Sequence, residues 1–202
     1  MAGLRLEGLQ PRRLAPVELE VPAGRCLALH GPSGAGKTLL LRAIADLDPN
    51  AGEVWLDRTP RSALPAPEWR RRVAYVPAES HWWAPRVGDH APRWDPAGIA
   101  RLDLPPEVLE WEVTRLSSGE RQRLALLRAL ANAPEALLLD EPSANLDADH
   151  TARLEGLVGD YRAAEGAAVI WVSHDPAQRR RVAEGSACIA GGTLAPEALP
   201  WS

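Results

Sequence analysis

The sequence predicts an α/β fold in which a parallel sheet is covered by helices on both faces. Several short segments are apolar at every position, as expected for strands that are buried on both sides. Helical segments alternate with these strands along the chain. The length of 202 residues fits one compact domain with its own core. We therefore expect a single domain over residues 1–202, interrupted by an insertion.

The first half of the chain alternates short strands with one helix. Residues 4–21 alternate weakly between apolar and polar side chains, and Pro11, Pro16 and the following Pro22 interrupt them, which predicts edge strands of a small sheet. The apolar run at 26–29 predicts a buried strand, and a glycine-rich turn leads from it into a helix over 37–45. Residues 54–56 and 73–76 predict two further short strands.

The second half begins with the insertion. Six prolines and four tryptophans between residues 77 and 116 interrupt any long periodic element, so we expect short helices and loops there. A longer helix should follow over 119–131, and the inserted helical subdomain as a whole spans about 80–130. The runs at 136–139 and 169–172 predict buried strands, and apolar side chains at helical spacing predict a helix over 149–164.

Composition excludes several classes of protein. Charged residues make up 25% and hydrophobic residues 46%, as in ordinary globular proteins. A net charge of −4 gives no basic footprint for nucleic acid. Two cysteines, Cys26 and Cys188, cannot form a disulfide framework, and no apolar run is long enough to cross a bilayer. The N-terminus lacks the apolar stretch of a signal peptide, so we expect that a second chain would hold this one at any membrane.

One glycine-rich motif carries the strongest chemical signal. It matches G-x-x-x-x-G-K-[ST] and predicts a phosphate-binding loop, with backbone amides converging on the phosphate oxygens. Lys37, the only lysine among 23 basic residues, should reach the β- and γ-phosphates, and the Thr38 hydroxyl should ligate Mg²⁺. The alternative is a glycine-rich turn that matches by chance. The motif consists of Gly31, Pro32, Ser33, Gly34, Ala35, Gly36, Lys37 and Thr38.

A buried strand that ends in two carboxylates supplies the second signal. Asp140 ends the apolar run and is placed to hold Mg²⁺. Glu141 follows it on the opposite face and can deprotonate the attacking water. Acidic pairs are common at strand ends, so this motif alone is a weak signal. It becomes a strong signal for a nucleotide site only because the phosphate loop is also present.

A third motif, Leu116-Ser-Ser-Gly-Glu120, precedes a predicted helix and points to a family. Together with the two motifs above, with Ser143–Asp147 and with His174 in Val-Ser-His-Asp, it resembles the nucleotide-binding subunits of ATP-binding cassette (ABC) proteins over nearly the whole chain. The family signature reads LSGGQ. The resemblance implies a P-loop NTPase cassette with a mixed, mostly parallel sheet flanked by helices and an N-terminal antiparallel β subdomain.

The resemblance also implies roles for individual residues. Two cassettes would sandwich two ATP molecules, so that the signature residues Ser117, Ser118, Gly119 and Glu120 of one chain face the phosphate loop of the other. His174 would contact the γ-phosphate or the attacking water and, with Glu141, would be catalytic. The alternative for His174 is a histidine that caps the end of a strand.

Three positions depart from the family pattern. Ala78 stands where a glutamine usually ligates the metal, with Glu79 beside it as an alternative ligand. Ser118 replaces a glycine of the signature. No aromatic residue precedes Trp55, so the usual stacking partner of adenine is missing or lies elsewhere. Each departure predicts weaker nucleotide binding or slower turnover.

The tryptophans after position 78 have two interpretations. In the family, this segment contacts a membrane subunit, and Trp82, Trp83 and Trp94 could anchor that contact. They could equally fill the core of the helical subdomain. The arginine triplets at 70–72 and 179–181 predict solvated faces.

The resemblance predicts an ATPase that uses ATP and Mg²⁺ to drive transport through a separate membrane permease. It would lie in the cytoplasm on the inner face of the cell membrane and form a homodimer or heterodimer of cassettes without nucleic acid. The short length is similar to small bacterial cassettes for iron or metal export. Two alternatives remain: a low-activity regulatory or partner cassette, and a soluble ABC ATPase outside transport.

Overall fold

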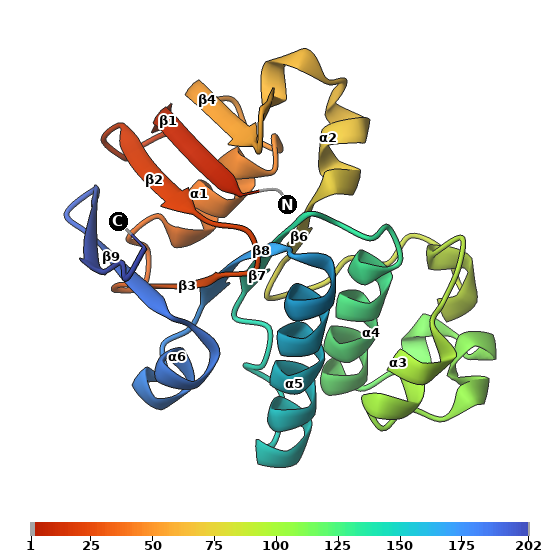
Figure 1. Cartoon of the computed structure of the whole chain (residues 1–202). Helices are drawn as coiled ribbons and strands as arrows, with labels where there is room; N and C mark the ends of the chain where they lie inside the picture. Colours follow the sequence, from red (N-terminus) through yellow and green to blue (C-terminus); the bar gives the residue numbers. More distant parts are fainter. Residues whose placement is uncertain (1–2, 202) are drawn as a thin grey trace.

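A computed structural model describes residues 3–201, which form two sheets and their covering helices (Figure 1). The larger sheet has six strands in the order β10-β9-β3-β8-β7-β6. Its strand pairs are parallel except for the antiparallel β9–β10 hairpin, so the predicted parallel sheet is confirmed as mixed and mostly parallel. Its strands are β3 (Cys26–His30), β6 (Val73–Val76), β7 (Ala136–Asp140), β8 (Ala168–Val172), β9 (Gly185–Ala190) and β10 (Thr193–Ala198).

The smaller sheet is the predicted N-terminal antiparallel subdomain. Its order is β2-β1-β4-β5, with Leu4 of β1 opposite Val21 of β2 on one side and Leu56 of β4 on the other. Of the two strands expected at an edge, β2 lies there, whereas β1 lies inside the sheet. The strands are β1 (Leu4–Gln10), β2 (Val17–Val21), β4 (Ala51–Leu56) and β5 (Thr59–Pro60).

Two hydrophobic cores explain why the larger sheet is apolar at every position. Side chains alternate between the faces of a strand. Leu138 therefore joins the core beneath the smaller sheet and α1, while Leu137 and Leu139 join the core beneath α4 and α5. In Figure 1, α4 and α5 lie below the larger sheet and the smaller sheet lies above it.

The long helices agree with the sequence, whereas two short ones were missed. Helix α1 (Lys37–Ile44), α4 (Ser118–Leu130) and α5 (Ala148–Glu165) match the predicted segments within two residues. Helix α5 ends at Gly166, whose φ of 68° is the left-handed cap that favours glycine. The helices α2 (Ala66–Arg72) and α6 (Pro176–Val182) each carry an arginine triplet in their last turn.

Short elements fill the chain between β6 and α4. They are the 3₁₀ turns η2 (Val87–His90), η3 (Pro106–Glu110) and η4 (Val113–Arg115), and helix α3 (Pro96–Arg101). Another 3₁₀ turn, η1 (Arg61–Ala63), precedes α2. None of the described helices is long and apolar enough to cross a membrane.

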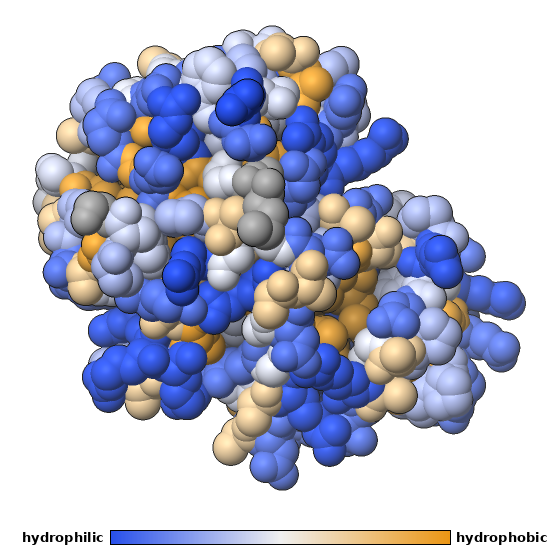
Figure 2. Space-filling view, viewed as in Figure 1, coloured by the Kyte–Doolittle hydropathy of each residue, from blue (hydrophilic) through white to orange (hydrophobic). Residues whose placement is uncertain are grey.

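The tryptophans of this segment divide between the two interpretations. Trp82 and Trp94 pack against the second core, as fillers of the subdomain do. Trp83 is 71% exposed and lies edge-on to His90. The face seen in Figure 2 is mostly hydrophilic, and apolar side chains gather where the lobe that carries α3 meets the rest of the molecule. Of these three tryptophans, only Trp83 is exposed enough to contact another chain.

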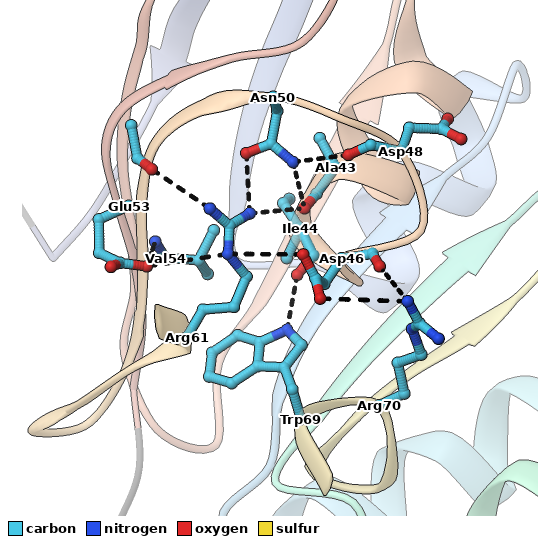
Figure 3. Close-up of polar contacts among 11 residues, drawn as sticks. Ala43, Ile44, Asp46, Asp48, Asn50, Glu53, Val54, Arg61, Trp69 and Arg70 are labelled. Atoms are coloured by element: carbon cyan, nitrogen blue, oxygen red, sulfur yellow. Dashed lines mark hydrogen bonds and ion pairs between the residues drawn. The ribbon is translucent and has the colours of Figure 1, made fainter. Parts of the chain in front are cut away.

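A polar network fixes the C-terminal end of α1 (Figure 3). The last carbonyls of a helix have no partner inside it. Arg61 Nη1 donates to the Ala43 carbonyl at 3.2 Å and to Asn50 Oδ1 at 2.8 Å, and Trp69 Nε1 donates to the Ile44 carbonyl at 2.9 Å. These contacts tie α1 to η1 and α2, and so hold in place the helix that begins at Lys37.

Candidate active site

The glycine-rich loop joins the end of β3 to the start of α1. Gly31 has a φ of 139°, and a Cβ there would lie 2.1 Å from the Ile189 carbonyl oxygen of β9. Gly36 has a φ of 110°, and a Cβ there would lie 2.8 Å from Leu14 Cδ2. A side chain is therefore excluded at Gly31 by conformation and by space, whereas at Gly36 the positive φ is the main obstacle. Lys37 is 8% exposed, and its Nζ donates to the Gly31 carbonyl at 2.9 Å and to the Pro32 carbonyl at 3.2 Å, which holds the ammonium against the loop.

The end of β7 brings Asp140 to the first turn of α1. Thr38 Oγ1 donates to Asp140 Oδ2 at 2.7 Å, across 102 residues of sequence. Both groups are hard oxygen donors, the kind that Mg²⁺ prefers, and they meet beside the phosphate loop. The pair therefore fits the metal role that the sequence predicted for Thr38 and Asp140.

Tyr75 is a member of this site that the sequence did not reveal. Its hydroxyl donates to Asp140 Oδ2 at 3.1 Å. Burial, followed by the charge of Asp140, raises the pKa of the phenol, so Tyr75 stays protonated and acts as a donor. The contact arises because β6 and β7 are parallel neighbours, with Tyr75 opposite Leu138.

Glu141 and His174 meet at the carboxyl ends of β7 and β8. Glu141 Oε1 lies 3.0 Å from His174 Nε2. The backbone of Glu141 has a φ of 52°, which is uncommon for a side chain with a Cβ, and its amide donates to the Val172 carbonyl at 3.2 Å. This left-handed turn at the end of β7 places Glu141 beside His174, which precedes α6.

The charge state of Glu141 suits a proton acceptor. Burial raises the pKa of its carboxyl, and the nearby charges of His174 and Lys37 oppose that shift only in part. A general base works best with a pKa close to the operating pH. The raised pKa therefore moves Glu141 toward the range in which a carboxylate accepts a proton from water.

The signature residues form the start of α4. Ser117 is the N-cap: its hydroxyl accepts from the Glu120 amide at 3.2 Å, and its own amide donates to Glu120 Oε2 at 2.8 Å. Ser118 is the first residue of the helix and has no positive φ, so a Cβ there strains nothing. Gly119 packs on the segment after Glu141, where a Cβ would lie 3.2 Å from the Asn145 carbonyl oxygen.

The site residues thus fall into two groups. The phosphate loop, Thr38, Asp140, Glu141 and His174 converge at one edge of the larger sheet. Within residues 3–201, no hydrogen bond or ion pair joins residues 117–120 to the phosphate loop. Ala78 follows β6 and offers no polar side chain, and its exposed neighbour Glu79 has no hydrogen bond or ion pair in the same range.

Comparisons with known proteins identify the family of the chain. A family model described as ABC transporter matches residues 14–144. An aliphatic sulfonates import ATP-binding protein of Rhodococcus jostii is 36% identical over 91% of this chain and 68% of its own length. An Fe(3+) ions import ATP-binding protein of the same organism is 37% identical over 93% of this chain and 58% of its own. The chain thus spans less than two thirds of the iron protein's length.

Two solved structures share the fold. The ATP-binding subunit of an ABC transporter superposes with a TM-score of 0.88 at 22% identity, covering 97% of this chain and 90% of that one. A dimeric ATP-binding cassette in a post-hydrolysis state, bound to ADP and Pi, gives 0.82 at 23% identity, covering 97% and 98%. With the family model and the curated relatives, they confirm the predicted cassette fold. The chain belongs to the ABC transporter family and is an ATP-binding, ATP-hydrolysing subunit of it.

Proposed function

We propose that this chain hydrolyses ATP to drive a separate membrane permease, with Glu141 as the catalytic base. The observation that carries the proposal is the convergence of the phosphate loop, the Thr38–Asp140 pair and the Glu141–His174 pair at one edge of the sheet. Each group has the chemistry that phosphoryl transfer to water requires, namely positioning, charge neutralisation and a proton acceptor.

The proposed roles follow from the contacts. Lys37 and the backbone N–H groups of residues 33–38 hold the phosphates of ATP at the start of α1. Thr38 and Asp140 hold Mg²⁺, which when bound offsets charge on the phosphates. Glu141 accepts a proton from the attacking water, and the His174 imidazole, 3.0 Å from Glu141, holds the carboxylate and the water in position.

The active unit in this proposal is a dimer. Ser117 and the Gly119 amide lie at the N-terminus of α4, which favours an anion. They would hold the γ-phosphate bound by the opposite cassette. The dimeric neighbour with ADP and Pi supports this arrangement.

The permease would dock near the segment after β6, and the subunit would lie on the inner face of the membrane. Trp83 is exposed there beside a cavity of about 190 Å³ that is also lined by Tyr75, Pro77 and Arg128. The guanidinium of Arg128 lies 4.8 Å from the centre of the Trp83 ring, so the aromatic side chain is held in place at the surface. The relatives named above are import proteins, which supports uptake rather than export as the direction of transport.

The substitution Glu141→Gln tests the catalytic assignment. It keeps the shape of the side chain but removes the base, so we expect ATP hydrolysis to fall by about 10²- to 10⁴-fold while ATP still binds. Light scattering with MgATP should then show a trapped dimer. The control is Glu110→Gln, an exposed glutamate of η3, which should hydrolyse ATP at the normal rate. Normal hydrolysis by Glu141→Gln would remove Glu141 from the mechanism.

A second candidate is a low-activity cassette that works with a different, more active partner. Ala78 cannot supply the amide that the family uses at the metal, and Glu120 brings a carboxylate to the signature. Both features slow hydrolysis in a homodimer. The Ala78 and Glu120 substitutions argued in the Discussion separate this candidate from an active homodimer.

A further inference from the structure

Three side chains of metal-binding type meet at the opposite side of the phosphate loop from Asp140. They are His30 at the end of β3, Cys188 in β9 and Glu197 in β10. One ligand atom from each lies within 4.8 Å of the other two. His30 Nε2 is already 2.7 Å from Glu197 Oε2.

The sheet itself brings these residues together. His30 and Cys188 are direct partners in the parallel β3–β9 pair, so their side chains project from the same face. Glu197 lies in the adjacent strand at a shift in register between Pro196 and Ala198. Such irregularities redirect a side chain, and this one turns Glu197 toward His30. Three neighbouring strands therefore each contribute one donor without any loop that must fold over the site.

We propose that His30, Cys188 and Glu197 bind a Zn²⁺-type transition-metal ion. Imidazole nitrogen, thiolate sulfur and carboxylate oxygen are the donors of zinc sites, with metal–ligand distances of about 2.0 to 2.3 Å. Donors around a tetrahedral ion then lie roughly 3 to 4 Å apart, so a shift of about 1 Å closes the observed triangle. The three donors leave a fourth position for water.

The surroundings favour a soft metal over Mg²⁺ or Ca²⁺. A cavity of about 580 Å³ opens onto His30, Ser186 and Glu197, and gives an ion access. Arg179 and Arg180 of α6 line the same cavity. Their positive charge opposes any cation that is held by charge alone, so binding depends on the covalent character of the thiolate and imidazole bonds.

The position of the site links it to the nucleotide loop. His30 directly precedes Gly31, and Gly31 packs against the Ile189 carbonyl, one residue beyond Cys188. A metal at this point would join β3, β9 and β10 beneath the phosphate loop. It uses no residue of the Thr38–Asp140 pair, so the two metal sites are separate.

Cobalt titration of the full chain without nucleotide tests the proposal. Co²⁺ replaces Zn²⁺ in such sites and gives a thiolate-to-metal charge-transfer band only when sulfur is a ligand. We expect this band at one Co²⁺ per chain and its loss on addition of Zn²⁺. The other thiol, Cys26, is buried outside this group, and burial raises its pKa to about 12, so Cys26 does not compete for the metal.

Matched variants identify the ligands. Cys188→Ser should abolish the band, while Cys26→Ala should keep it. His30→Gln and Glu197→Gln should weaken Co²⁺ binding at least tenfold, since even the loss of an outer-shell partner costs about 10- to 100-fold. His81→Gln, an exposed histidine elsewhere, should bind as the original chain does.

Thermal unfolding gives an independent readout. Zn²⁺ binds only the folded site, so at hundredfold excess over its dissociation constant it should raise the melting temperature by about 5 to 10 °C, and not in Cys188→Ser. Absence of the band at saturating Co²⁺, or its persistence in folded Cys188→Ser, overturns the proposal.

Discussion

At the scale of single residues, the Tyr75 hydroxyl is the group with the clearest untested role. It donates to the same oxygen of Asp140 that accepts from Thr38. A donor that fixes the orientation of a metal-binding carboxylate typically changes metal affinity or activity by 10- to 100-fold when it is removed. Tyr75 is thus a positioning residue for Asp140.

We expect Tyr75→Phe to raise the Mg²⁺ concentration needed for half-maximal ATPase activity by about tenfold. The matched control is Tyr161→Phe, because Tyr161 is the only other tyrosine and also donates one partly buried hydrogen bond, to the Pro134 carbonyl at 2.8 Å. Both variants lose a similar hydrogen bond, but Tyr161→Phe should leave the Mg²⁺ dependence unchanged. Equal Mg²⁺ curves for the two variants would show that Tyr75 serves stability alone.

Ala78 offers a second prediction at this scale. We expect low basal ATPase activity in the original chain and an increase of about tenfold in Ala78→Gln, because a glutamine carbonyl can ligate Mg²⁺ and a water whereas alanine cannot. The competing hypothesis makes Glu79 the ligand. Glu79 is exposed, so we expect Glu79→Ala to hydrolyse ATP normally. A higher Mg²⁺ requirement in Glu79→Ala, without a gain in Ala78→Gln, would favour the competing hypothesis.

The sequence could identify those residues whose roles follow from a short, contiguous motif. The loop at 31–38 and the Asp140–Glu141 pair are contiguous, and their elements were predictable from apolar runs. Tyr75 was not identified, because its contact with Asp140 depends on which strands become neighbours in the sheet. The group of His30, Cys188 and Glu197 was not predicted for the same reason. Cys188 follows His30 by 158 positions, and Glu197 follows Cys188 by 9.

At the scale of elements, burial explains which helices were predictable. Helix α5 buries Leu154 and Val158 at helical spacing, and the hydrophobic pattern revealed it. Helix α2 buries one residue, Trp69, and α6 buries only Gln178. A single buried position cannot reveal the helical spacing of apolar residues, so the sequence did not predict these two helices. The strand β10 is mostly exposed and contains Pro196, so it also lacks the pattern of a strand.

The contacts of Arg61 make a prediction about the stability of α1. The side chain is 12% exposed and donates to the Ala43 carbonyl at the end of the helix and to Asn50 Oδ1. Removing this charged donor leaves Asn50 Oδ1 without a partner, although the Ala43 carbonyl still accepts from the Asp46 amide. Because hydrogen bonds to charged groups contribute about 1.5 to 3 kcal/mol, Arg61→Ala should lower the free energy of unfolding by about 2 kcal/mol. Urea denaturation measures this loss as a lower midpoint at unchanged slope.

Arg70 provides the control. It donates to the Asp46 carbonyl at 2.5 Å from a side chain that is 43% exposed. Exposed contacts of this kind contribute about 0 to 1 kcal/mol. If Arg70→Ala lowered the free energy of unfolding as much as Arg61→Ala, the contacts of Arg61 at the end of α1 would not stabilise the helix more than an exposed contact does.

At the scale of the whole molecule, one chain carries only half of each proposed site. The phosphate loop and the signature lie in different parts of the cassette, so in the proposed dimer the γ-phosphate bound by one chain would meet residues 117–120 of the other. Glu120 then becomes decisive. Burial raises the pKa of its carboxyl, but hydrogen bonds from the Ser117 amide and hydroxyl outweigh that effect and lower the pKa overall. Glu120 is therefore ionised at neutral pH, and in the proposed dimer it would repel the phosphate of the opposite site.

We expect Glu120→Gln to tighten ATP-dependent dimerisation by about tenfold. Two like charges about 4 Å apart repel by about 1 kcal/mol in water and about 4 kcal/mol near a protein surface, and tenfold corresponds to about 1.4 kcal/mol. Glutamine matches the family signature and keeps the cap, because its carbonyl can accept from the Ser117 amide as the carboxylate does. The measurement is the dissociation constant of the MgATP dimer by light scattering, made with Glu141→Gln in both chains so that hydrolysis does not separate them. Added salt screens the repulsion, so it should strengthen the Glu120 dimer more than the Glu120→Gln dimer. Equal affinities at low salt would place Glu120 away from the phosphate.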